Sequence, residues 1–300
     1  MKCLLVTKTQ NSVFGKIVLS FVLAIANAGW VGVDVRPTQK RFRDIPIQES
    51  GQYSQLSDDE RKELVWMAKA AASAYPDGDK PLGYRSLSKK EWNACAIDCS
   101  ELEYTEDGFF RIGSGLRGRV MIHMLNEGRI ILSLSGCDFA LGKDELIKDV
   151  KTCVHQYVYG NGEQYEQALR LMTGLLKCRP RTQLWIVGHS LGGSLAAYLA
   201  LKLPESKTNV KCATFNAYGI SPQLSITVAE KEIANHRVRN VYASKDPIYN
   251  WTIPVVSSFE RPIHLGSSYK IEGMGDEWDQ HGLDALIRLM IKGRTAWQGL

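Results

Sequence analysis

The chain has 300 residues, of which 44% are hydrophobic, and this is enough to bury one large α/β core. Its formal net charge is +5, but residues 1–43 hold seven basic residues and one acidic residue. The other 30 basic and 31 acidic residues nearly balance, which argues against nucleic acid as a partner.

The N-terminal segment has the pattern of an export signal. Lysines within residues 2–16 precede an uncharged stretch over residues 17–33, and Ala26-Asn27-Ala28 offers an A-x-A cleavage site. We predict a signal peptide over residues 1–28 and a secreted, periplasmic or envelope-associated protein. The apolar run is short for a membrane span, and an uncleaved membrane anchor or a buried N-terminal helix is the alternative.

Two further regions follow the predicted signal peptide. Residues 29–55 are expected to form a linker, because much of this range is rich in Arg, Pro, Gln and Ser. Residues 56–300 are expected to form one α/β domain.

Helix and strand patterns alternate along this domain. Taken in chain order, they predict a helix over residues 61–74, a polar stretch through 111, strands over 118–125 and 129–134, helices over 143–157 and 163–177, strands over 184–187, 210–215, 238–243 and 269–271, and a closing helix over 281–291. This order predicts a mostly parallel sheet with helices on both faces.

Seven cysteines do not fix the redox compartment. Cys95 and Cys99 lie in a polar, loop-like stretch and can pair with each other if they are oxidised, which the sequence leaves open. Cys153, Cys178 and Cys212 lie in apolar segments, which favours small core residues. The Cys and His spacing predicts no metal site.

The most informative segment runs from Gly188 to Gly193. An apolar strand pattern precedes its G-x-S-x-G sequence and a helix pattern follows, which is the context of a nucleophile elbow. Gly188 and Gly192 lack the Cβ that a tight turn would crowd. Ser190 is the candidate nucleophile and the Leu191 N–H a candidate oxyanion donor. The alternative is an inert serine in an ordinary glycine-rich turn.

A serine nucleophile needs a histidine base, and the base needs an acid to orient it. Three histidines follow Ser190. His281, which lies at a loop-to-helix junction, and His264, which precedes a predicted strand, are the candidates, and we expect His236 on the surface.

Asp246 is the preferred acid because it follows a strand at its carboxyl end, where α/β folds place their chemistry. Its alternative role is that of a turn aspartate before Pro247. Three other acids are weaker candidates because they crowd the histidine in sequence: Asp276, Asp279 and Asp284. His189, next to Ser190, is expected to be structural.

At these residues the chain resembles the class 3 lipases, a family of α/β-hydrolases. The resemblance spans residues 58–291 and is carried by the elbow and by five further segments: Ala72-Ser73-Ala74-Tyr75, Ile131 to Cys137, Thr214 to Gly219, the surroundings of Asp246 and the surroundings of His281. It implies an α/β-hydrolase fold and a Ser190–Asp246–His281 triad.

The resemblance also implies that the Cys137 backbone N–H is the second oxyanion donor. The turn Ser135-Gly136-Cys137 departs from the family pattern because it lacks both the arginine and the hydroxyl residue. This departure bears on the turnover rate. Cys137 as a core filler is the alternative.

The function that the resemblance implies is hydrolysis of lipid-like acyl esters, of lipase or phospholipase A type, with neither metal nor organic cofactor. A thioesterase, acyltransferase or peptidase on the same fold is the enzymatic alternative, and a degenerate binding module is the other. A lipid or acyl ester is the expected partner, at a membrane or micelle surface, and the oligomeric state is open.

Several segments are candidates for the substrate groove and its cover. Tyr249, Trp251 and Trp278 either line an acyl groove or pack elsewhere. Residues 138–143 and 221–236 are candidate lids. The second lid would use the apolar residues Leu224, Ile226, Val228 and Ala229, and a permanently packed helix is the alternative.

Overall fold

The computed structural model describes nine stretches of the chain: 51–95, 102–137, 149, 152, 162–204, 209–222, 224–250, 262–273 and 280–295, with side chains described to residue 292. Several predictions therefore lie outside the described residues and stay predictions. They concern residues 1–50, Cys99, residues 138–143, most of the helix over 143–157, Cys153, Trp251, Asp276, Trp278 and Asp279.

The described strands form one sheet of ten strands. The order from edge to edge is β1 (Gly51–Gln52), β10 (Ser267–Ile271), β9 (Val238–Ala243), β8 (Val210–Phe215), β7 (Gln183–His189), β6 (Asn126–Leu134), β5 (Arg117–His123), β4 (Phe109–Arg111) and β3 (Glu103–Tyr104), with β2 (Tyr84–Ser86) paired to β5. In this spatial order, β1, β10, β9, β8, β7 and β6 are parallel to one another. The strands on the other side of β6, which are β5, β4 and β3, pair antiparallel. The predicted, mostly parallel sheet is confirmed.

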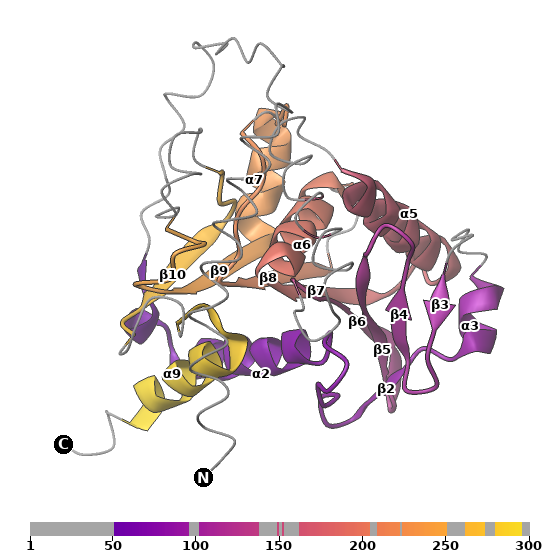
Figure 1. The fold of residues 1–300 in the computed structure, drawn as a ribbon, viewed down its shortest axis with the longest axis horizontal. Helices are drawn as coiled ribbons and strands as arrows, with labels where there is room; N and C mark the ends of the chain where they lie inside the picture. The colour runs from indigo at the N-terminus through magenta and orange to yellow at the C-terminus, as the bar shows by residue number, and fades with distance from the viewer. Residues whose placement is uncertain are drawn as a thin grey trace, which may run out of the picture.

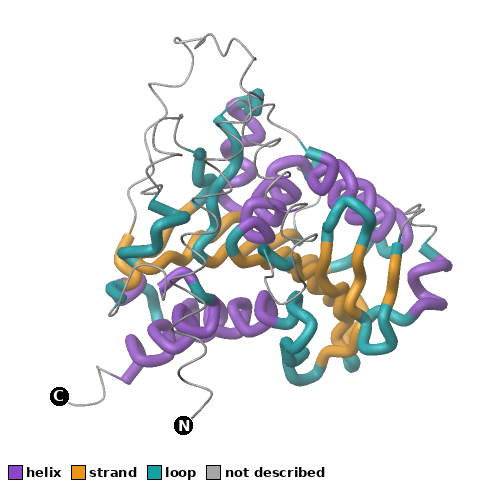
Figure 2. Tube along the Cα trace, viewed as in Figure 1, coloured by secondary structure: helices purple, strands orange, loops and turns teal. Residues whose placement is uncertain are grey.

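Helices cover both faces of this sheet, as Figure 1 shows. On one face lie α2 (Asp58–Ala72) and α9 (Leu283–Thr295), and on the other lie α5 (Glu163–Cys178), α6 (Leu191–Lys202) and α7 (Val228–Arg237). In Figure 2 the strands form a band between these two helical layers. The shorter elements are η1 (Tyr53–Gln55) and α3 (Lys89–Ala94).

Two apolar cores fill the space between the layers. Alternate side chains of the central strands enter opposite cores, as Cys212 and Ala213 of β8 do. Both faces of these strands are therefore buried, which explains their nearly continuous apolar sequences. Among the described helices, none is long and apolar enough to cross a membrane.

The central strands β8 and β9 have the predicted bounds, while several edge elements were not predicted. Within the predicted polar stretch, the described residues form β2, α3, β3 and β4. Residues 51–55 belong to the domain and not to a linker, because β1 pairs with β10 and Tyr53 is buried in the core below the sheet. The closing helix begins at Leu283, two residues after His281.

A disulfide joins the end of α3 to the end of α5. Cys95 bonds to Cys178, 83 residues away in sequence, across a Cα–Cα distance of 5.0 Å. Cys95 is therefore not available to Cys99, the partner that the sequence left open, and the assignment of Cys178 as a core filler is wrong. The sequence could not indicate this pairing, since the tertiary fold brings the two helix ends together. Cys212 is buried, as predicted.

We expect the Cys95→Ser/Cys178→Ser double variant to lose about 2–4 kcal/mol of unfolding free energy, because the bond closes a long loop in the unfolded chain. Urea unfolding of the oxidised wild type and the variant measures this loss. Dithiothreitol should lower the wild-type midpoint and leave that of the variant unchanged. Equal midpoints without reductant would contradict the prediction.

Candidate active site

Ser190 lies in a sharp turn between β7 and α6. Its backbone has φ 56° and ψ −125°, a conformation that residues with a side chain seldom adopt. The turn is too crowded for side chains on its glycines. A Cβ on Gly188 would lie 2.1 Å from the Gly192 carbonyl oxygen, and one on Gly192 would lie 2.2 Å from the Leu134 carbonyl oxygen. The elbow geometry predicted for this segment is present.

The structure brings Ser190, His281 and Asp246 together in one hydrogen-bonded chain. The His281 Nε2 lies 3.0 Å from the Ser190 Oγ, and the His281 Nδ1 lies 2.6 Å from the Asp246 Oδ2. Because an ionised carboxylate only accepts hydrogen bonds, Nδ1 carries the ring proton and Nε2 is free to accept the serine hydroxyl proton. This is the arrangement in which a histidine can act as a base toward serine.

Asp246 is fully buried three residues after the end of β9. Its Oδ1 accepts a hydrogen bond of 2.6 Å from the Tyr249 N–H, so the carboxylate also has the local turn contact that was the alternative for this residue. The two contacts use different oxygens and fix the carboxylate plane toward His281.

Asn216 holds the backbone that carries His281. Its φ of 45° lies in the left-handed region, which asparagine tolerates better than most residues. Its side-chain amide donates to the carbonyl oxygens of Gln280 at 2.7 Å and His281 at 3.0 Å, and its amide oxygen accepts from the Ala243 N–H at 2.9 Å. Asn216 thus links the loop of the histidine to the strand that leads to Asp246.

The other two histidines lie elsewhere. His264 stacks on Tyr249 with ring centroids 3.9 Å apart, and Tyr249 stacks in turn on Tyr242. His236 is exposed at the end of α7, as predicted. Of the three, His281 is the histidine bonded to both Ser190 and Asp246.

The turn after β6 packs directly against the elbow. A Cβ on Gly136 would lie 2.8 Å from the Ser190 Cβ. The Gly136 carbonyl accepts a hydrogen bond of 3.1 Å from the Arg117 guanidinium, which forms a buried ion pair of 2.6 Å with Asp149. Arg117 comes from the neighbouring strand β5, so an arginine contacts this turn although none lies within it.

Both candidate oxyanion donors flank Ser190. Leu191 is the first residue of α6, where backbone N–H groups lack partners within the helix. Cys137 follows Gly136, and its half-buried side chain packs against the core above the sheet. The Cys137 side chain therefore packs as the core-filler alternative expects. Its backbone N–H as an oxyanion donor stays a prediction.

The candidate covers and groove residues have other roles where the structure describes them. Tyr249 is buried in the stack on His264, so it packs in the interior. In the predicted lid over 221–236, Leu224 and Ile226 pack on the core, whereas Val228 and Ala229 are exposed. The apolar residues therefore do not form one covering face.

The helix α7 of this segment is anchored at the far end of α6 from Ser190. Arg237 donates to the carbonyl oxygens of Ala200 and Leu203 at 3.0 and 2.8 Å, and Lys202 pairs with Glu230 at 2.8 Å. In this structure the helix is packed, which favours the packed-helix alternative, and the lid over residues 221–236 stays a prediction.

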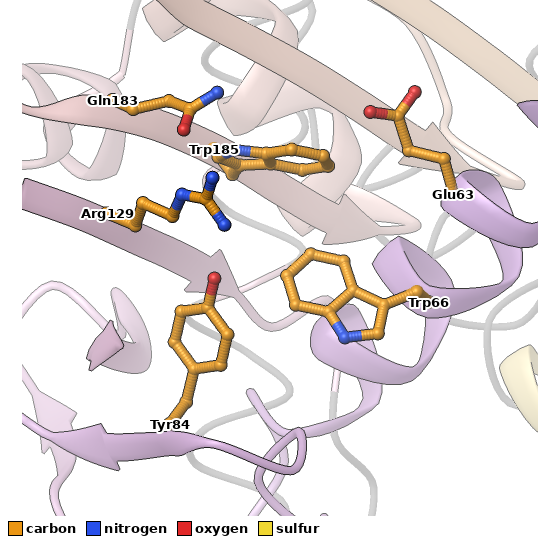
Figure 3. A pocket seen from close by; sticks show the side chains of 6 residues that line it. All are labelled: Glu63, Trp66, Tyr84, Arg129, Gln183 and Trp185. Carbon is orange, nitrogen blue, oxygen red and sulfur yellow. The ribbon is translucent and has the colours of Figure 1, made fainter. Parts of the chain in front are cut away.

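A separate cavity of about 270 Å³ lies toward the amino-terminal ends of β6 and β7, away from the ends that carry the Ser190 turn (Figure 3). Its lining consists of three aromatic and three polar residues, Trp66, Tyr84, Trp185, Glu63, Arg129 and Gln183. No residue predicted for the active site lines this cavity. It is therefore distinct from the Ser190 site.

His189 is buried next to Ser190 and cannot reach the reacting atoms as a base. Its Nε2 lies 2.7 Å from the His281 carbonyl oxygen. Burial and the nearby His281 lower the pKa of His189 to about 3. The ring is therefore neutral at physiological pH, as a structural role requires.

Sequence reasoning assigned no roles to Arg117 and Asn216. Each acts through contacts with segments far away in the chain. For Asn216 there was one signal: asparagine at the end of a central parallel strand, beside the elbow strand, suits a left-handed backbone.

The elbow serine is hydrogen-bonded to a histidine, and this histidine is hydrogen-bonded to a buried aspartate. At the carboxyl ends of a mostly parallel sheet, this arrangement is that of a lipase-like α/β-hydrolase, the class that the sequence predicted. The model of one family, described as the Tle-like phospholipase domain, matches residues 66–255. This match covers more than half of the chain, and the chain belongs to this family. It is accordingly an ester hydrolase of lipase-like type. The match includes Ser190 and Asp246 and ends before His281.

No curated protein sequence is significantly similar to the chain. Similar solved structures are fungal lipases of low identity. Lip2 lipase from Yarrowia lipolytica is 10% identical with a TM-score of 0.49, over 75% of this chain and 82% of its own. A triacylglycerol lipase from Penicillium expansum is 14% identical with a TM-score of 0.44, over 75% and 83%. Rhizomucor miehei lipase is 13% identical with a TM-score of 0.42, over 79% and 80%. Similarity at this level carries no information about the substrate.

The lowered pKa of His189 predicts acid sensitivity. Between about pH 6.5, the ordinary value for histidine, and about pH 3, the unfolded chain binds a proton at His189 that the folded protein does not. Above about pH 6.5, His189 is neutral in both states. As the pH falls from there toward about 3, protonation of the unfolded chain lowers the free energy of unfolding. In His189→Gln, the free energy of unfolding should therefore fall less steeply from pH 7 to pH 4 than in the wild type.

Urea unfolding at each pH measures this slope. The matched control is His236→Gln, which removes an exposed histidine whose solvation changes little on unfolding. A His189→Gln slope equal to that of the wild type would contradict the prediction.

Proposed function

We propose that the chain hydrolyses acyl ester bonds of lipids, as a lipase or phospholipase A, with Ser190 as nucleophile, His281 as base and Asp246 as the orienting acid. The observation that carries this proposal is the hydrogen-bonded chain from Ser190 Oγ through His281 to the buried Asp246 carboxylate. Family membership supports a lipid ester as the substrate class.

The reaction follows from this geometry. The Ser190 oxygen attacks the ester carbonyl carbon while His281 Nε2 takes the hydroxyl proton. The carbonyl oxygen becomes an anion, which the backbone N–H groups of Leu191 and Cys137 stabilise. His281 then protonates the departing alcohol, and an acyl group stays on Ser190. Water, deprotonated by His281, releases the fatty acid and restores the serine.

The same triad serves related reactions. Attack by an alcohol in place of water would make the protein an acyltransferase, and a thioester or amide substrate would make it a thioesterase or peptidase. A binding module without turnover is the non-enzymatic alternative. Product analysis with phospholipid micelles and triacylglycerol emulsions, with different acceptors, and with a thioester and an amide as substrates separates these activities.

Ser190→Ala and His281→Ala should each lower kcat on p-nitrophenyl esters by about 10⁴ or more, because the members of a triad act as a unit. His264→Ala is the matched control and should keep substantial turnover, since His264 stacks on Tyr249 outside the triad. The reverse pattern for the two histidines would move the base to His264. Retention of more than a few per cent of activity in Ser190→Ala would refute the nucleophile.

Export of the protein is a further part of the proposal, and it rests on the leader sequence. If Ala26-Asn27-Ala28 is a cleavage site, the mature protein should begin at Gly29. N-terminal sequencing of protein from fractionated host cells checks this. A chain that still begins at Met1 in the membrane fraction would indicate an anchor, and one in the cytosol would contradict export.

A further inference from the structure

We propose that Tyr75 and His189 are positioning residues that together hold the oxyanion turn and the His281 backbone in register with Ser190. This inference rests on the proposed function and deepens it. Neither side chain touches the reacting atoms in this role. Their effect is exerted through backbone groups on either side of the nucleophile.

The Tyr75 hydroxyl connects two of the three segments. Tyr75 lies just after α2, and its oxygen accepts a hydrogen bond of 3.1 Å from the Gly136 N–H of the oxyanion turn. The same hydroxyl lies 2.8 Å from the Nδ1 of His189. Gly136 precedes Cys137, so the peptide plane that Tyr75 holds adjoins the proposed oxyanion donor.

The hydrogen-bond directions follow from the partners. The His281 carbonyl oxygen can only accept, and it lies 2.7 Å from the Nε2 of His189, so Nε2 carries the ring proton. A neutral imidazole then has an unprotonated Nδ1, which accepts the Tyr75 O–H. The Tyr75 oxygen in turn accepts from Gly136. All groups in this chain of three hydrogen bonds are satisfied in one direction.

The chain connects positions far apart in the sequence. It begins at Gly136, passes through the side chains of Tyr75 and His189, and ends at the backbone of His281. His189 directly precedes Ser190, so the same residue fixes the last peptide of β7. The buried imidazole of His189 thus connects the oxyanion turn, the nucleophile and the backbone of the base.

Each end of this chain also has an independent anchor. The Gly136 carbonyl is held by Arg117 at 3.1 Å, and the His281 carbonyl accepts a second hydrogen bond of 3.0 Å from Asn216. Loss of the Tyr75 hydroxyl should therefore leave the fold intact. It should loosen the alignment of the turn with Ser190, and small misalignments at a reacting centre are costly in rate.

The test is Tyr75→Phe, which removes the hydroxyl and keeps the ring. We expect kcat on p-nitrophenyl esters to fall roughly 10- to 100-fold with KM within about twofold, and the rate of fluorophosphonate labelling of Ser190 to fall in parallel. The matched control is Tyr53→Phe. This variant removes another buried hydroxyl, which lies away from the active site and donates a hydrogen bond of 3.2 Å to the Arg61 carbonyl oxygen. It should change kcat less than twofold.

A second pair of variants tests the imidazole. His189→Gln keeps an N–H donor for the His281 carbonyl, whereas His189→Met offers none. We expect His189→Gln to retain more of kcat than His189→Met. Adding Tyr75→Phe to His189→Met should lower kcat little further, because the chain of hydrogen bonds is already interrupted in that variant.

Two outcomes would overturn the inference. One is a Tyr75→Phe kcat and labelling rate within twofold of the wild type with only the melting temperature lowered, which would show a purely structural hydroxyl. The other is a wild type that does not react with fluorophosphonate, which would refute the nucleophile as well. If the wild type is labelled but cleaves no lipid ester, only the substrate proposal fails, and the labelling rates decide on Tyr75 and His189.

Discussion

The close contact between the ends of β6 and β7 and the start of α6 is the constraint on which the site depends. At Gly188, Gly192 and Gly136, a Cβ would lie within 3 Å of backbone atoms of a neighbouring segment. This contact is accompanied by the positive φ of Ser190, whose side chain reaches His281 Nε2. It also lets a helix begin directly after the serine, and the first N–H groups of a helix lack acceptors within it. A strained residue of this kind persists only when its surroundings determine it completely, and here two apolar cores and the parallel strands do so.

Parallel strands bring their carboxyl ends to one edge, and this explains why residues from distant segments meet there. The position of the base, however, depends on buried polar groups and not on the sheet. His281 lies in a short turn before α9, and its backbone is held by the amide of Asn216 and the ring of His189. Buried polar groups are costly unless they are paired, so these contacts define the loop more sharply than apolar packing would. The neutral state of His189 belongs to the same logic, since burial removes the water that would stabilise a charged ring and thereby lowers its pKa.

The sequence predicts the central part of this molecule well because that part is determined locally. Strands buried on both faces have continuous apolar sequences, and the elbow needs its glycines within five residues, so β7, β8, β9 and Ser190 could be located directly. The order of serine, acid and histidine then selected the residues that the structure brings together. Elements of two or three residues, such as β2 and β3, carry no periodicity, and their existence depends on a neighbour such as β5. The disulfide could not be predicted for the same reason, because the partner of Cys95 is set by tertiary packing.

The oxyanion turn shows how a departure from a sequence pattern can be offset in space. The turn Ser135-Gly136-Cys137 lacks an arginine of its own, yet the guanidinium of Arg117 reaches its carbonyl from the adjacent strand, and the Tyr75 hydroxyl accepts its N–H. Both contacts act on the backbone of Gly136, so they constrain the turn whatever side chain follows. Since an oxyanion donor is a backbone N–H, its usefulness depends on how firmly the peptide is oriented. The cysteine at position 137 is therefore compatible with the proposed chemistry, and the rigidity of the turn comes from residues 19 and 61 positions away in the chain.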